Sequence, residues 1–164
     1  MRYVGSKRRI AKDLFSVMTK YYQSKNPCFV DAFCGGCNMI EVVPHDWKRI
    51  ANDKNEALIH MFVALTSGCK DFHFPKRISE NFYKTVKQSW INGDVDKFPL
   101  YLQGFVGGVA GFRGIFFDSY VGRYVKRDYI QEGIRNLMKQ IPKLRGIIFV
   151  QEILRICIHC LKIV

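Results

Sequence analysis

The sequence has no long hydrophobic stretch and no charged-then-apolar leader, and its five prolines are never adjacent. Its longest apolar runs are far below the ~18 residues of a membrane-spanning helix, so we expect a cytoplasmic protein that makes no membrane contact. A G-x-G-x-x-G pattern is also missing, as is any residue pair suited to hydride transfer. An NAD-dependent oxidoreductase is therefore a weak alternative.

Acidic residues are scarce. The 26 Lys and Arg outnumber 14 Asp and Glu, which gives a net charge of +12. Because each cation placed on a phosphate releases condensed counterions, this imbalance favours a nucleic-acid partner over a merely basic, soluble surface. The composition is otherwise that of a globular protein, with 48% hydrophobic residues, and the 164 residues suffice for one core with or without a smaller lobe.

The six cysteines include two C-x-x-C pairs, Cys34 with Cys37 and Cys157 with Cys160. Together the pairs could form a four-thiolate zinc site. However, 119 residues separate them, and neither pair has the glycine and aromatic surroundings of a zinc ribbon. We therefore expect no metal site, and we expect the thiols to be reduced.

The most informative stretch is the run from Phe29 to Gly36, an apolar strand pattern that ends at two adjacent glycines. Glycines at the carboxyl end of a buried strand let backbone N–H groups approach a ligand. A second short strand, residues 49–53, ends in Asp53, which lies 17 positions after Gly36. An acid at that place binds ribose hydroxyls in nucleotide-binding folds, so the pattern favours a nucleoside cofactor other than NAD over a turn that binds nothing.

Apolar residues recur at helical spacing over about residues 8–22 and 56–65. A short helix is also expected from the Gly35-Gly36 turn to about Val43, where Pro44 stops it. With strands at 28–33 and 49–53, the elements after the first helix therefore have a βαβα order. This order implies an α/β fold in which helices cover a parallel sheet. A third strand is expected at residues 146–150.

Strand signals are sparse between about residues 67 and 145, where helical patterns cover 78–90, 100–106 and 130–140. The glycine- and aromatic-rich segment 107–120 is expected to be a flexible loop. From residue 113 to 145 there are eight Lys or Arg and three acids. Cations interleaved with rings suit single-stranded or flipped bases, because each stacked base contributes ~1–3 kcal/mol.

Short motifs follow one another in a fixed order over about residues 1 to 149. They are Tyr3-x-Gly5-x-Lys7, Phe29-Val30-Asp31-x-Phe33-Cys34-Gly35-Gly36, Asn52-Asp53-x-Asn55, Gly111-Phe112-Arg113-Gly114-x-Phe116-Phe117 with Tyr120, Arg127-Asp128-Tyr129, and Pro142-Lys143-Leu144-Arg145-Gly146. In this order and spacing the chain resembles the adenine-N6-specific DNA methyltransferases of the Dam type, particularly the short phage and prophage enzymes. Each motif is modest alone.

The resemblance implies a Rossmann-like, S-adenosylmethionine-dependent methyltransferase sheet, here incomplete, with a mainly helical target-recognition insertion. Residues 1–66 would be the cofactor-binding part, 67–145 the DNA-recognition lobe, and 146–164 a return strand with a divergent tail. The implied reaction transfers a methyl group from S-adenosylmethionine to N6 of a flipped adenine in duplex DNA. DNA methylation of this kind accompanies restriction-modification systems, but the sequence does not indicate one.

The resemblance also implies residue roles. Tyr3 would stack near the cofactor adenine, Lys7 would contact the cofactor, and Asp53 would bind its ribose. The implied cofactor-binding set is Tyr3, Lys7, Asp31, Phe33, Gly35, Gly36 and Asp53, and the implied DNA-binding set is Arg113, Phe116, Arg123, Lys126 and Arg127.

One family motif is missing, because the chain contains no Asp-Pro-Pro-Tyr and thus no catalytic residue can be assigned. The sequence beyond Val150 also departs from the family, and a truncation or frameshift near that residue is expected. We therefore expect a chain that cannot transfer methyl groups efficiently by itself. An exposed sheet edge would favour marginal stability, self-association or complementation by a downstream fragment. A non-catalytic DNA-binding module with a vestigial cofactor pocket is the alternative.

Overall fold

A three-stranded parallel sheet lies at one end of the molecule in the computed structural model, which describes residues 1–124 and 127–151. Its strands are β1 (Cys28–Asp31), β2 (Lys48–Asn52) and β5 (Ile148–Val150), in the order β1-β2-β5. The register pairs Val30 with Ile50 and Ile50 with Ile148. The three expected strands and their parallel arrangement are thus confirmed. Within the described residues β1 has one neighbouring strand, β2.

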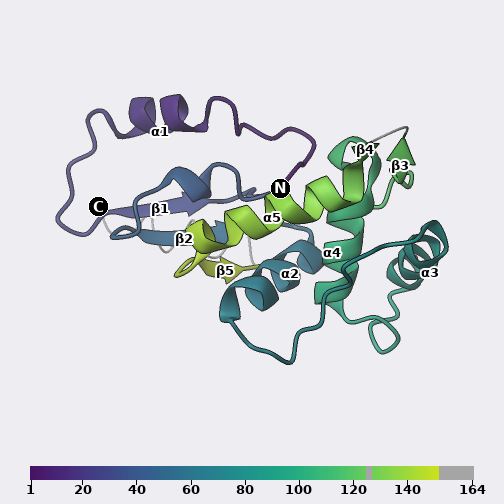
Figure 1. Cartoon of the computed structure of the whole chain (residues 1–164). Coiled ribbons are helices and arrows are strands. Elements are labelled where there is room, and N and C mark those ends of the chain that lie inside the picture. The colour runs from purple at the N-terminus through teal and green to yellow at the C-terminus, as the bar shows by residue number, and fades with distance from the viewer. Residues whose placement is uncertain (125–126, 152–164) are drawn as a thin grey trace.

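Five α-helices and a short hairpin complete the described chain (Figure 1). The helices are α1 (Ala11–Thr19), α2 (Glu56–Ser67), α3 (Glu80–Ile91), α4 (Leu100–Ala110) and α5 (Tyr129–Leu144), with 3-10 turns η1 (Ile40–Val42) and η2 (Phe112–Gly114). The hairpin is formed by β3 (Arg123–Tyr124) and β4 (Arg127–Asp128). Figure 1 shows α3 and the hairpin at the end away from the sheet, with α5 running from the hairpin back to it. No helix in the described part of the chain is both long and apolar enough to cross a bilayer.

Three helices begin at side-chain caps that the sequence provides. The side chains of Asn55, Ser79 and Asp128 accept hydrogen bonds from the backbone N–H three residues later, at 3.3, 3.2 and 2.9 Å. Such caps satisfy N–H groups that have no partner inside the helix. They fix the starts of α2, α3 and α5 close to the positions that helical spacing predicts.

The end of α5 is fixed to the sheet by Arg49, a buried residue of β2. Its Nη1 donates to the carbonyl of Lys143 at 2.8 Å, and its Nη2 donates to the carbonyl of Arg145. A guanidinium bonded to the last carbonyls satisfies acceptors that have no partner inside the helix. Arg49 therefore anchors α5 to the middle strand.

The expected helix at 100–106 extends to Ala110, so the expectation of a loop starting at Gly107 was wrong. The reason is packing. Gly104, Gly107 and Gly108 are buried in α4, and a Cβ added at Gly104 would lie 1.9 Å from the carbonyl oxygen of Ala57 in α2. Because α4 packs closely against other segments, these glycines lie in the core. The conformational freedom that glycine has in an unpacked chain does not prevent them from being helical here.

The first helix is shorter than the predicted 8–22 and its apolar side is largely uncovered. Phe15 packs on the rings of Phe29 and Trp47 at centroid distances of 5.8 and 5.4 Å, whereas Met18 is 60% exposed and Tyr22 45% exposed. Helix α1 thus contacts the sheet mainly through one ring. The hairpin β3–β4 was not anticipated, because strands of two residues are too short to show alternation.

We predict that Gly104→Ala lowers the free energy of unfolding by about 1–3 kcal/mol, because the new methyl group must push α2 and α4 apart. Urea denaturation followed by circular dichroism measures this. Gly108→Ala in the same helix is the matched control, since the nearest atoms to its Cβ would be side-chain ends, Sδ of Met1 at 3.3 Å and Cδ2 of Leu58 at 3.5 Å, and no backbone atom. Equal stability of the two variants would contradict the close-packing account.

Candidate functional site

The glycine turn after β1 is held by the end of β2. The N–H of Cys34 donates to the carbonyl of Asn52 at 2.8 Å, and the side-chain amide of Asn52 donates to the carbonyl of Ala32 at 2.8 Å. Next along the turn, the N–H of Gly35 donates to Oδ2 of Asp53 at 2.7 Å. The turn and the acid after β2 are therefore directly bonded at the carboxyl edge of the sheet.

Glycine is required at position 35 for two reasons. Its φ of +46° is in the left-handed region, and an added Cβ would lie 2.7 Å from a ring carbon of Tyr3. The Tyr3 ring therefore lies directly on the turn. Burial raises the pKa of the Tyr3 hydroxyl, with smaller contributions in the same direction from Asp53 and Cys34.

These groups line a cavity of about 230 Å³ between the N-terminal segment and the turn. The structure brings all of the predicted cofactor-binding residues into its lining: Tyr3, Lys7, Asp31, Phe33, Gly35, Gly36 and Asp53. These residues come from three segments that are far apart in the sequence. Their binding to a cofactor remains a prediction.

Two carboxylates supply most of the polarity of this cavity. Asp31 has a buried Oδ2 with no hydrogen-bond partner, and burial raises the pKa of this carboxyl. Asp53 accepts from Gly35 through Oδ2 and from the N–H of Asn55 through Oδ1 at 2.9 Å. Each carboxylate oxygen can accept more than one bond, so Asp53 keeps capacity for a ligand donor. Phe33 is 75% exposed at the rim.

A residue that the sequence did not single out, Gln140 of α5, holds the N-terminal segment against the turn. Its Nε2 donates to the carbonyls of Gly36 and Cys37 at 2.9 and 3.3 Å, and its Oε1 accepts from the Met1 ammonium group. The side-chain amide of Asn38 donates to the carbonyl of Met1 at 3.2 Å. Gln140 lies among the buried apolar positions of α5, and a polar residue on that stripe is the signal that could have identified it.

The N-terminal segment is also bonded to the segment predicted to read DNA, since the N–H of Val4 donates to the carbonyl of Gly114 at 3.0 Å. Arg113 in this segment is exposed, with a left-handed φ of +55° and its guanidinium 5.1 Å from the centre of the exposed Phe112 ring. Phe116 instead packs against Trp90 at 5.5 Å. The structure therefore presents Phe112, rather than the predicted Phe116, as the exposed ring of the segment.

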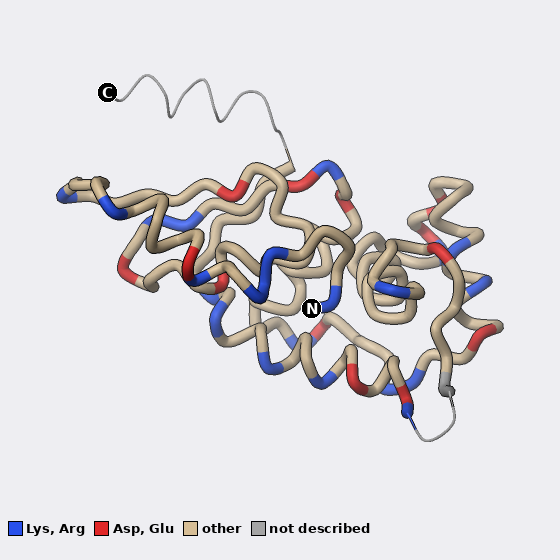
Figure 2. Tube along the Cα trace, turned by 90° about the horizontal axis from the view of Figure 1, so that it is seen from above, with Lys and Arg blue, Asp and Glu red and all other residues tan. Residues whose placement is uncertain are grey.

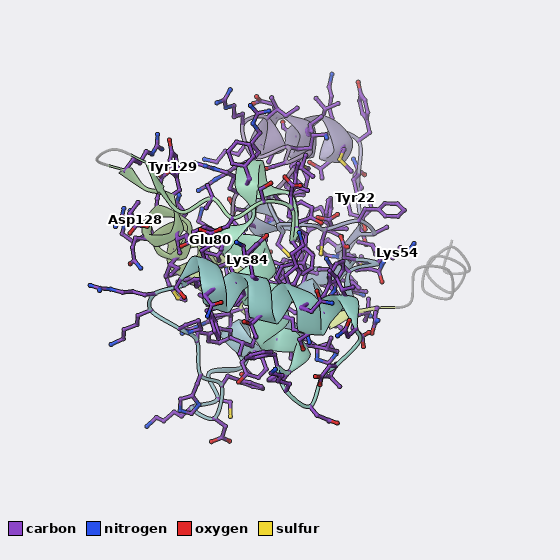
Figure 3. All side chains as sticks on the ribbon, turned by 90° about the vertical axis from the view of Figure 1, so that its right-hand side faces the viewer. Tyr22, Lys54, Glu80, Lys84, Asp128 and Tyr129 are labelled. Atoms are coloured by element: carbon purple, nitrogen blue, oxygen red, sulfur yellow. The ribbon has the colours of Figure 1, made fainter. Side chains whose placement is uncertain are left out.

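The remaining predicted DNA-binding residues lie at the hairpin. Arg127 is exposed, forms two hydrogen bonds with Glu132 and lies 4.9 Å from the centre of the Tyr129 ring. Arg123 is in β3, where the backbone alone is described, and Lys126 lies outside the described residues. Figure 3 shows Asp128 and Tyr129 beside the hairpin, on the side of the molecule opposite Lys54, the residue next to Asp53.

The described residues contain no group of three or more His, Cys, Asp or Glu side chains suited to a metal ion. Burial raises the pKa of the Cys37 thiol well above its usual range, which disfavours the thiolate that metals bind. Cys157 and Cys160, the other half of the discounted zinc pattern, lie outside the described residues.

The family model of the D12 class N6 adenine-specific DNA methyltransferases matches residues 3–95, more than half of the chain. The chain belongs to this family. The matched range of the D12 class methyltransferase model includes every predicted cofactor-binding residue and ends before α4. A search of the curated proteins found no match. Membership of the D12 class relates the chain to DNA adenine methylation, which agrees with the resemblance seen in the sequence.

The buried Met1 amine predicts a pH dependence of stability. Its pKa is lowered from 8.0 to about 6, mainly by burial and then by Arg8. Because the unfolded chain binds the proton more tightly, stability should fall by on the order of 2 kcal/mol as the pH falls from 8 to 6. Urea titrations across this range measure the change.

Glu41 raises the pKa of this amine, so the variant Glu41→Gln should shift the loss of stability to lower pH. The two profiles should nearly coincide above pH 7 and separate as the pH approaches and falls below 6, because only the folded-state pKa differs. If wild type and variant gave the same profile between pH 7 and 5, the amine would not be the group that titrates.

Proposed function

We propose that the chain binds S-adenosylmethionine in the cavity beside the glycine turn and duplex DNA at its basic lobe, as an adenine N6-methyltransferase by descent. The observation that carries the proposal is the convergence of the predicted residues on that cavity, with Tyr3, Gly35 and Asp53 in mutual contact or close proximity. When bound, S-adenosylmethionine supplies a methyl group activated by its sulfonium.

The residues of the cavity fit such a ligand. The carboxylates of Asp31 and Asp53 suit the ammonium and the ribose hydroxyls, and the buried Oδ2 of Asp31 has no partner within the chain. The exposed Lys7 can reach a carboxylate, and the ring of Tyr3 offers an apolar face to a purine. The glycine turn is held in place by its bond to Asp53, and its two glycines place no side chain between the backbone of the turn and a ligand.

The DNA side of the proposal depends on the exposed cations of the lobe. Arg113 and Arg127 are both exposed, and the hairpin that carries Arg127 leads directly into α5. Arg123 and Lys126 belong to the same hairpin sequence. Cations on adjacent projecting segments can neutralise several phosphates of one duplex. A flipped adenine would then enter beside the cofactor.

Methyl transfer also needs an acceptor near the adenine N6, since attack by a neutral amine on a sulfonium disperses positive charge. The family's Asp-Pro-Pro-Tyr is absent from the 164 residues. We therefore propose that this chain binds both ligands but turns over poorly alone. Among the described strands β1 lies at an edge of the sheet, where a strand from a second copy or a downstream fragment would pair.

Calorimetry with S-adenosylmethionine should show saturable binding that Gly35→Ala weakens by about tenfold or more, because the new methyl group displaces Tyr3 and a loss of 1.4 kcal/mol is tenfold. Gly68→Ala is the matched control. Its φ of +70° imposes similar backbone strain, but nothing lies within 4 Å of the added Cβ.

Wild-type protein without saturable heat would instead favour the non-catalytic DNA-binding module. If Gly68→Ala weakened binding as much as Gly35→Ala does, backbone strain rather than loss of the Tyr3 contact would be the cause.

A tritiated-methyl transfer assay on duplex DNA tests the second half of the proposal. We expect incorporation at or near background for the purified 164-residue chain, because no residue of the missing tetrapeptide can accept the N6 hydrogen bonds. Robust multiple turnover would refute this expectation and would require another acceptor in the chain.

A further inference from the structure

A second cavity lies on the other side of the N-terminal segment from the cofactor site. It has a volume of about 530 Å³, and Tyr3, Ser6 and Lys7 line both cavities. Its cations are Arg2, Lys7, Arg8 and Arg9, and no acidic residue lines it. The residue contributed by α5 is the neutral Asn136. The cavity is therefore polar, open and positively charged.

Little of this charge is neutralised. Arg2 lies 3.2 Å from Glu132, which also pairs with Arg127, and Arg8 lies 3.9 Å from the buried Glu41. Among the described residues Arg9 has no ion pair. Two acids outside the cavity thus offset only part of the charge of its four cations.

The buried amine of Met1 also lines the cavity. After burial itself, Arg8 is the largest cause of its lowered pKa; Glu41 and Cys37 act in the opposite direction, and Lys143 acts in the same direction as Arg8. A nearby cation disfavours the charged amine. The lowered pKa agrees with the excess of cations that line the cavity.

Positive charge continues from the cavity along α5. Arg135 and Lys139 are exposed, one on either side of Asn136 in sequence, and α5 begins directly after the hairpin that carries Arg127. Figure 2 shows basic positions recurring along α5 and in the N-terminal segment beside it. A single free anion needs only one cationic side chain. A line of cationic side chains instead fits a ligand with regularly spaced negative charges.

We propose that this cavity binds a backbone phosphate of duplex DNA, with Arg8 and Arg9 as the principal contacts. The proposal rests on the proposed function, and it extends the DNA interface from the hairpin to the wall of the cofactor cavity. Guanidinium groups suit this ligand, because their paired N–H donors match phosphate oxygens. The contact positions the duplex and carries no base sequence information.

The test is duplex-DNA binding by fluorescence anisotropy at several salt concentrations, for wild type, Arg9→Ala and the double variant Arg8→Ala/Arg9→Ala. Each lost phosphate contact should reduce the slope of log affinity against log salt by about 0.9. We expect reductions of about 1 for the single variant and about 2 for the double variant, with affinity lowered about tenfold or more at low salt.

The matched control is Lys25→Ala/Lys48→Ala. It removes the same charge from exposed positions that precede β1 and begin β2, at the amino edge of the sheet and away from both cavities. S-adenosylmethionine calorimetry on every variant reports whether the fold is intact. Arg9→Ala breaks no ion pair among the described residues, so it keeps the test valid if the double variant unfolds.

If the Arg8→Ala/Arg9→Ala variant and the control gave the same affinity and salt slope, the phosphate site would be wrong while the proposed function stood. If wild type bound no duplex, both would fail. If inorganic phosphate bound to wild type but not to Arg9→Ala, while the two proteins bound duplex DNA with the same affinity and salt slope, the cavity would be a free-anion site and the DNA assignment would be overturned.

Discussion

The buried side-chain amide of Gln140 joins three parts of the molecule that must keep fixed positions for the site to exist. It bonds to the glycine turn through Gly36 and Cys37, to the chain start through Met1, and it belongs to α5. A buried amide left without hydrogen-bond partners lowers the stability of the fold by about 1–3 kcal/mol. The bonds of Gln140 therefore keep the three parts in place together. Together with the bonds from Asn38 to Met1 and from Val4 to Gly114, they hold the N-terminal segment on the turn, where it forms one wall of the cavity.

Helix α5, which carries Gln140, connects the hairpin to the sheet. It begins at the hairpin, where Asp128 caps it, and it ends at the middle strand, where Arg49 binds its last carbonyls. The sequence predicts a boundary between lobe and return strand near residue 145, but the helix before that boundary contacts the glycine turn through Gln140. Helix α5 thus connects the hairpin proposed to bind DNA to the glycine turn, and displacement of one should affect the other.

Much of the candidate site could be predicted from sequence because its chemistry is local. A buried strand, two glycines and an acid after the next strand fix the turn and Asp53 with little help from distant residues. Where the structure depends on packing between distant segments, the prediction failed. Gly107 and Gly108 were expected in a loop, yet they lie in a helix packed against other segments. The contact between Phe116 and Trp90 was likewise not visible in the sequence. Such outcomes depend on which elements meet, and one sequence does not show that.

The segment from Tyr3 to Arg9 separates two cavities of opposite character. On one side Asp31 and Asp53 present carboxylates, and on the other Arg8 and Arg9 present guanidinium groups. A ligand that carries ammonium and sulfonium charges is favoured by the first environment, and a phosphodiester is favoured by the second. The carboxylates belong to the ends of β1 and β2, whereas the guanidinium groups belong to the N-terminal segment. The opposite charges would therefore favour each of the two proposed ligands in its own cavity. Tyr3, Ser6 and Lys7, which line both cavities, would keep the two ligands adjacent, as transfer of a group from one to the other requires.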